Sequence, residues 1–279
     1  MSKLLHANFL RLRKDKYFWI GNFVMGLYGV IDSVGQYRNV KVYDMSVTFD
    51  SIFFASHIVI GLLIAAFCSL FVGTEYSDGT IRNKLMVGCN RRDIYLSNFI
   101  TCAAAGVFMN FAYMFTACIA GIPLFGFFEM GWQEIVIYIV NGMLMVVAFA
   151  AIFTMLSMLN QNKALVAIIS MMGIFALLFL SMYITMKLGE PEFTDAVSMS
   201  ETVGDTVTQT IQRIPNPMYP SPSQRSVYQF LFDFLPTSQG IQISSGAVTH
   251  PGTIGLYSIA IAAAANIIGV FCFSRKDLK

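Results

Sequence analysis

Charged residues are scarce in this sequence. Only 12% of its 279 residues are Asp, Glu, Lys or Arg, whereas 56% are hydrophobic. Soluble domains carry about 25% charged residues. The deficit excludes an ordinary soluble core and indicates a polytopic membrane protein. The net charge is only +2, and we expect no nucleic-acid partner.

Sequence signatures of chemical sites are also missing. The chain has no Gly-x-x-x-x-Gly-Lys-Ser/Thr loop for ATP and no His-Glu-x-x-His zinc pair. The apolar runs offer no facing pair of ionisable groups for an intramembrane hydrolase, since Asp32 and Glu134 lie near predicted ends. No cysteine falls in the long outer loop, so no disulfide framework is implied. We therefore predict a protein that is not an enzyme and that binds no metal and no cofactor.

Six apolar stretches are long enough to cross about 30 Å of hydrocarbon, which takes roughly 20 residues. In lipid such stretches must be helical, because their backbone groups find no water to bond. The sequence thus predicts an all-α polytopic fold, with residues 1–279 forming a single transmembrane domain. The predicted spans are Tyr17–Val34, Ser51–Val72, Tyr95–Leu124, Glu134–Met158, Ala164–Met186 and Thr253–Phe273.

Basic residues set the orientation. An even number of spans places both termini on one side, and both the head and the tail are basic. With the termini inside, the inner segments hold 13 of the 18 Lys and Arg residues but only 5 of the 16 Asp and Glu residues. Because cytoplasmic loops are enriched in Lys and Arg, we predict a multi-pass cell-membrane protein with both termini in the cytoplasm.

Two segments outside the spans have a predicted role. In residues 1–16, one helical face carries Leu5, Phe9 and Leu12, which suits an interfacial amphipathic helix; a flexible basic leader is the alternative. Residues 187–252 form the large outer loop. Its first part is acidic, its middle part is turn-rich, and its apolar run 227–235 is too short to span, so we expect short outer helices before the sixth span.

A polar insert, Gly73-Thr-Glu-Tyr-Ser-Asp-Gly-Thr-Ile-Arg-Asn-Lys84, separates the second and third spans. We expect the insert to break the helix and to lie in the cytoplasm. Ser77, Asp78 and Thr80 are favourable N-cap residues, and Gly79 permits a sharp turn. Ile81 and Leu85 are spaced to form an apolar ridge, with Arg82 and Lys84 at its rim. A simple solvated turn is the alternative.

A few polar residues fall at mid-membrane depth. They are either hydrogen-bonded between helices or part of a substrate path. The candidate path residues are His57, Asn110, Asn141 and Asn266.

The segment Phe71–Leu85, followed by Gly88 and Arg91-Arg92-Asp93-Ile94-Tyr95-Leu96, resembles permease subunits of ABC exporters of the second class, which have six spans. Three other features are consistent with this resemblance: the basic head, the basic tail and the large outer loop, which contains Phe234-Leu235-Pro236-Thr237-Ser238-Gln239-Gly240. The resemblance implies that residues 73–94 form a cytoplasmic coupling segment that docks on a separate ATPase. The implied docking residues are Glu75, Tyr76, Ser77, Asp78, Gly79, Thr80, Ile81, Arg82, Asn83, Lys84 and Leu85. In the family, an acidic residue like Glu75 helps to hold this junction.

The same resemblance implies the partners and the cargo. ATP and Mg would be bound by ATP-binding-cassette subunits, and a second permease subunit, identical or related, would complete the path within the membrane lipids. The chain is most similar to permeases of Gram-positive bacteria that export antimicrobial or amphipathic peptides, of the lantibiotic-immunity, bacitracin-resistance and phenol-soluble-modulin types. An ion (sodium) or drug efflux permease of the same architecture and a membrane receptor or scaffold are the alternatives.

Overall fold

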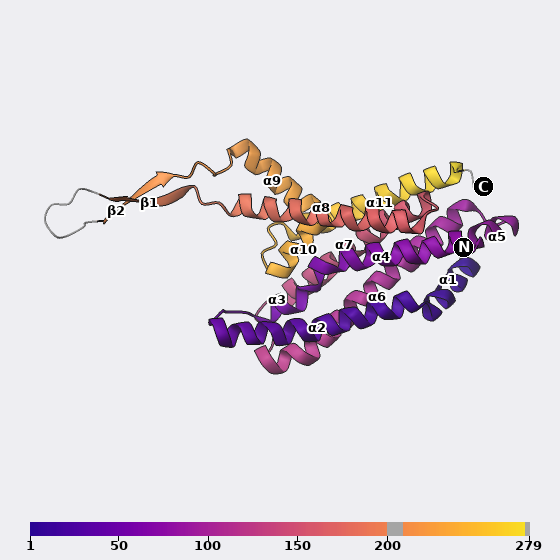
Figure 1. Cartoon of the computed structure of the whole chain (residues 1–279), viewed down its shortest axis with the longest axis horizontal. Coiled ribbons are helices and arrows are strands. Elements are labelled where there is room, and N and C mark those ends of the chain that lie inside the picture. Colours follow the sequence, from indigo (N-terminus) through magenta and orange to yellow (C-terminus); the bar gives the residue numbers. More distant parts are fainter. Residues whose placement is uncertain (200–208, 277–279) are drawn as a thin grey trace.

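The computed structural model describes residues 1–199 and 209–276, and this part of the chain is mostly helical (Figure 1). Glu201 and Asp205 of the acidic outer loop lie outside the described residues. The elements are α1 (Ser2–Lys14), α2 (Lys16–Tyr43), α3 (Phe49–Phe54), α4 (Ser56–Ser77), α5 (Thr80–Met86), α6 (Arg91–Phe125), α7 (Trp132–Leu159), α8 (Lys163–Gly189), β1 (Phe193–Met199), β2 (Gln209–Pro215), α9 (Pro222–Phe234), α10 (Pro236–Ser245) and α11 (Pro251–Arg275).

Five helical segments in the described chain are long and apolar enough to cross a membrane: α3 together with α4, then α6, α7, α8 and α11. The first predicted span, residues 17–34, lies within α2, which is not one of these five. Asn22 and Asp32 make this helix less apolar. It packs along α6, where the Tyr113 hydroxyl donates a hydrogen bond to Asp32 Oδ2 over 2.9 Å. Five of the six predicted spans therefore meet the criteria of length and hydropathy, and the first stays a prediction.

The helix ends within the predicted insert, but later than the predicted end of the second span at residue 72. Helix α4 continues through Gly73 to Ser77. Gly73 instead permits close packing: a Cβ atom built on it would lie 2.4 Å from Cβ of Lys163 at the start of α8. The glycine is thus needed for helix contact, and the turn comes at Gly79, whose φ is +66°.

Both chain termini and α5 lie at one end of the molecule, and the β1–β2 hairpin projects from the other (Figure 1). The basic residues of α1, of the α4–α6 connection and of the α11 C-terminus are thus grouped at one end. The predicted topology requires this grouping.

The described chain is mostly helical, as the all-α prediction requires, and the segment between α8 and α11 adds one short pair of strands. Strands β1 and β2 pair in an antiparallel hairpin, with Phe193 opposite Pro215. Helices α9 and α10 follow, and α9 begins with a capping box between Ser221 and Gln224. Helix α10 packs against α4, α7 and α8. Its buried Gln239 accepts a hydrogen bond from Ser258 of α11 over 2.7 Å.

Helix α4 runs through the core and contacts α6, α7 and α8. Glycines permit the close approach of these helices. A Cβ atom on Gly106 of α6 would lie 3.0 Å from both Ile64 of α4 and Val146 of α7. Such small-residue contacts are typical of membrane helix interfaces. This packing places the last turn of α4 at the end of the bundle that carries the termini.

Candidate functional site

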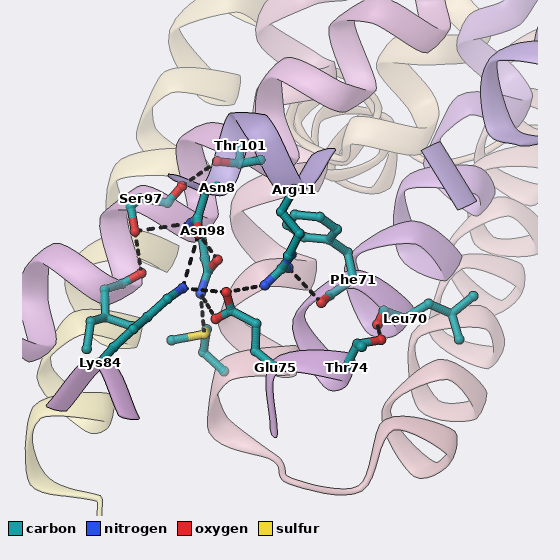
Figure 2. Close-up of polar contacts among 12 residues, drawn as sticks. Asn8, Arg11, Leu70, Phe71, Thr74, Glu75, Lys84, Ser97, Asn98 and Thr101 are labelled. Carbon is teal, nitrogen blue, oxygen red and sulfur yellow. Dashed lines mark hydrogen bonds and ion pairs between the residues drawn. The ribbon is translucent and has the colours of Figure 1, made fainter. Parts of the chain in front are cut away.

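A buried carboxylate, Glu75, lies in the last turn of α4. Its side chain has 0% exposure. It forms ion pairs with Arg11 of α1 and with Lys84 of α5. Its second oxygen accepts a hydrogen bond from Asn98 Nδ2 of α6 over 2.8 Å. Figure 2 shows these three side chains converging on Glu75 from three other helices.

Asn8 of α1 joins the same group of side chains. Its Nδ2 donates to Asn98 Oδ1 over 2.9 Å and to Ser97 Oγ over 3.3 Å, and its Oδ1 accepts from Lys84 Nζ over 3.1 Å (Figure 2). We refer to Asn8, Arg11, Glu75, Lys84 and Asn98 as the Glu75 cluster. Every buried polar group needs a partner, and here each partner comes from another helix. The Glu75 cluster therefore ties α1, α4, α5 and α6 together.

Arg11 makes two further contacts that fix it in place. It donates to the carbonyl oxygen of Phe71 over 2.9 Å, and its guanidinium lies 3.7 Å from the centre of the Phe71 ring. Two cations share one carboxylate in this cluster, so the charge of Glu75 is balanced in excess. Removing one partner of a buried ion pair leaves the other uncompensated, which is strongly destabilising.

Helix α5 is short, and its orientation differs from the predicted one. Its N-cap is Gly79, not Ser77, Asp78 or Thr80, and no side chain caps it. Ile81 is only 1% exposed, so it packs inward and does not form an exposed ridge. Lys84 is held by Glu75 and is not a rim residue.

The exposed side chains near α5 lie elsewhere. Met86 is 78% exposed and Val87 84% exposed, in the last turn of α5 and directly after it. Arg82 and Asn83 are also exposed, and Leu85 is half-buried. The structure therefore reverses the predicted faces of α5, because Ile81 and Lys84 face inward while Met86 and Val87 face outward.

A small hollow lies beside α5, where the α4–α5 turn approaches the loop between α7 and α8. Its volume is about 160 Å³, which is about the size of a cavity that accepts a benzene ring. The lining residues are Glu75, Tyr76, Ser77, Gly79, Ile81, Arg82 and Gln161.

The C-terminal segment is attached at the same end. Arg91 donates to the carbonyl oxygens of Phe273, over 3.3 Å, and of Lys276. Lys276 Nζ in turn donates to the Tyr76 hydroxyl and to the Met158 carbonyl oxygen, each over 3.2 Å. Burial lowers the pKa of Lys276 from its usual value.

The sequence did not identify Arg11, Asn98 or Lys276 as parts of this site. Each of them is an ordinary basic or polar residue near a span end. Arg11 lies 64 positions from Glu75 in the chain. No spacing pattern predicts such a contact; the one signal was an acidic residue, Glu75, directly after a predicted span and before several basic residues.

The four candidate path residues do not gather around one cavity in the described part of the chain. Asn110 and His57 are both buried. Ser56 donates a hydrogen bond to Asn110 Oδ1 over 2.8 Å, and His57 Nδ1 lies 2.9 Å from the carbonyl oxygen of Phe54. Asn141 donates to the carbonyl oxygen of Pro251, and Asn266 to that of Ala262, each over 2.8 Å. These contacts fit the alternative of hydrogen bonding within and between helices.

No group of three or more His, Cys, Asp or Glu residues with metal-binding geometry occurs among residues 1–199 and 209–276.

A family model described as ABC-2 family transporter protein matches residues 4–197, which include most of α1, all of α2 to α8 and the whole Glu75 cluster. No curated protein matches the sequence significantly.

Proposed function

The chain belongs to the ABC-2 family of transporter proteins, and we propose that its cargo is an amphipathic or antimicrobial peptide or another lipophilic compound. Family membership makes the chain a multi-pass transmembrane permease that is not itself catalytic. It also implies an ATP-binding-cassette partner, which would bind ATP and Mg and supply the energy of export.

The observation that carries the mechanism is the Glu75 cluster. Lys84 fixes α5 to α4, while Asn98 and Arg11 fix α4 to α6 and α1. A displacement applied to α5 would therefore move the ends of several helices together. In this proposal the coupling segment 73–94 is a rigid lever, and ATP hydrolysis in the partner moves it.

The partner would contact the exposed end of this lever. Met86 and Val87 present apolar surface, and Arg82 adds a charge beside the small hollow at α5. Exposed apolar side chains next to charged ones are typical of protein interaction sites. In this proposal Met86 and Val87, and not Ile81 and Leu85, form the apolar surface that docks on the partner.

A second permease subunit, identical or related, would complete the path. A groove of about 510 Å³ lies between α4, α8 and α10, and its lining is almost entirely apolar. Ile58, Leu178, Met182, Met186 and Ile241 line it. Flexible methionine side chains adapt to varied apolar ligands, which suits a lipophilic cargo passing between two facing subunits.

The proposed location is the bacterial cell membrane, with both termini and α5 in the cytoplasm and α2 as a sixth span. On its outward face α2 exposes Trp19, Phe23 and Ile31. These side chains would contact lipid while Asp32 stays paired with Tyr113.

Expression of the chain with its ATP-binding-cassette partner in a susceptible bacterium tests the cargo. The proposal predicts increased resistance to amphipathic peptides, and no increase with a partner variant that cannot hydrolyse ATP. Unchanged resistance to a peptide panel, together with sodium-stimulated ATPase activity, would instead identify an ion exporter.

A further inference from the structure

A groove with a basic mouth lies between the start of α6 and the end of α11, away from the Glu75 cluster. Its volume is about 510 Å³. The hydrogen bonds of Arg91 to the carbonyl oxygens of Phe273 and Lys276 hold the two helix ends side by side. The groove is therefore a fixed feature of the fold. Its lining includes Arg92, Leu96, Ile267, Val270, Phe271 and Arg275.

Two arginines stand at its mouth. Arg92 and Arg275 are both exposed, and neither forms an ion pair within the described part of the chain. The guanidinium of Arg275 lies 4.1 Å from the centre of the Phe271 ring. Stacking occupies the face of a guanidinium and leaves its in-plane N–H groups free to bind a phosphate. The nearest acidic neighbour of Arg92 in sequence, Asp93, is paired with the N-terminal ammonium over 3.3 Å.

Apart from Asn266 and Ser274, the rest of the groove is lined by apolar side chains. Leu96 and Val270 are half-buried along it, whereas Ile267 is 70% and Phe271 54% exposed. The apolar residues precede Arg275 along α11, so the apolar part leads from the basic mouth toward the middle of the span. A cationic end joined to an apolar channel complements a molecule with an anionic head and a hydrocarbon tail.

We propose that this groove binds one acidic phospholipid of the cytoplasmic leaflet. Its phosphate contacts Arg92 and Arg275, and one acyl chain lies along Leu96, Val270 and Ile267. The assignment rests on the proposed orientation, with the termini in the cytoplasm. Basic pockets between transmembrane helices on the cytoplasmic side are suited to acidic lipid head groups.

A lipid fits this groove better than a helix of another protein would. An apolar helix packed here would bury two arginines without an acidic partner, which is costly. A phospholipid supplies the neutralising phosphate itself. Its acyl chain also covers the exposed Ile267 and Phe271.

Lipid binding to the full-length chain, purified without its partner and without ATP, tests the proposal. Native mass spectrometry would follow titration with phosphatidylglycerol and with phosphatidylcholine of identical acyl chains. Each basic residue near an acidic lipid surface strengthens binding roughly fivefold. The double variant Arg92→Gln/Arg275→Gln should therefore bind phosphatidylglycerol about 25-fold more weakly. Its binding of phosphatidylcholine should weaken much less, because choline already neutralises the phosphate of that lipid.

Two further variants make the test specific. Arg13→Gln/Lys14→Gln removes the same two charges from α1 and should retain tight phosphatidylglycerol binding. Val270→Phe keeps the arginines but fills the apolar part of the groove, and should weaken the binding of both lipids. Free glycerol phosphate should not displace the bound lipid, because the acyl chain contributes to binding.

Undiminished phosphatidylglycerol binding by Arg92→Gln/Arg275→Gln would overturn the proposal. An equal loss in the α1 control would do so as well, because it would show only general attraction between charges. Displacement by glycerol phosphate would identify a simple anion site instead. None of these results depends on transport, so failure here is distinguishable from failure of the export function.

Discussion

The carboxylate of Glu75 and the ammonium of Lys84 form an ion pair between the last turn of α4 and the short helix α5. Only nine positions separate these residues, but the Gly79 turn lies between them. Arg11 and Asn98 bind the same carboxylate from two further helices. The Glu75 side chain thus holds α5 in position relative to the other helices.

Glu75→Gln should destabilise the protein by about 3 kcal/mol, because Arg11 and Lys84 would lose their shared counter-charge. Thermal unfolding of the purified chain in detergent measures the loss. Glu129→Gln, which alters an exposed carboxylate in the α6–α7 connection, is the matched control and should change stability by less than about 0.5 kcal/mol. Equal stability of the two variants would show that the Glu75 cluster contributes little.

Met86→Asp/Val87→Asp should leave folding intact and abolish stimulation of the partner's ATPase activity by cargo. Both side chains are exposed, so the charges cost little in the permease alone but would be buried at a docked interface. Val42→Asp, at the opposite end of the molecule, serves as the control for an added charge. Normal stimulation in the double variant would exclude this surface as the docking site.

Ile81→Asp should lower stability, unlike Met86→Asp/Val87→Asp, because the Ile81 side chain lies on the buried face of α5. An unpaired charge at that position should lower stability by several kcal/mol and loosen α5. Limited proteolysis at the α4–α6 connection, compared with wild type, measures the loosening. If Ile81→Asp were cleaved no faster than wild type, Ile81 would have to be exposed after all.

Gly73→Ala should be destabilising by about 1–3 kcal/mol, since its Cβ would lie 2.4 Å from Cβ and 3.2 Å from Cα of Lys163. The Cα atom of Lys163 is part of the α8 backbone, so a side-chain rotation of Lys163 cannot relieve this clash. Gly173→Ala is the matched control within α8, because no atom lies within 4 Å of its added Cβ. It should be neutral or stabilising by up to about 1 kcal/mol. Equal unfolding temperatures for Gly73→Ala and Gly173→Ala would contradict the close contact between α4 and α8.

Lys276 should give the protein a distinctive pH dependence at alkaline pH. Burial disfavours its charged form and lowers its pKa in the folded state below the usual 10.5. The unfolded chain therefore binds more protons between these two pKa values, and stability should rise with pH across that interval. The difference in stability between wild type and Lys276→Gln, measured at several pH values up to 10.5, should show this rise. A flat difference would contradict the effect of burial.

The sequence predicted the parts of the fold that hydropathy governs. Five helices match predicted spans because about 20 apolar residues in lipid have no other stable arrangement. The same reasoning ended the second span at Val72, whereas α4 continues to Ser77, since a glycine required by close helix contact looks the same in sequence as one that ends a helix. The β1–β2 hairpin was also missed, because the loop's polar and acidic composition indicated only irregular structure.

The geometry of the candidate site was not predictable from the sequence. Charge and glycine content drew attention to the segment around Glu75, and family resemblance suggested a role for it that stays a prediction. The direction in which Ile81 points depends on α4 continuing to Ser77, which shifts every later residue around α5. The contact of Arg11 with Glu75 depends on α1 folding back across the bundle, and no local pattern encodes that.

Photo-crosslinking tests whether the exposed end of α5 docks on the ATP-binding-cassette partner. A photoreactive benzoylphenylalanine would replace Val87 in cells that also produce the ATP-binding-cassette partner, and mass spectrometry would identify the crosslinked protein. The account predicts a crosslink to the ATPase from position 87 and none from position 42 at the opposite end of the molecule. A crosslink to the ATPase from position 42, with none from position 87, would contradict it.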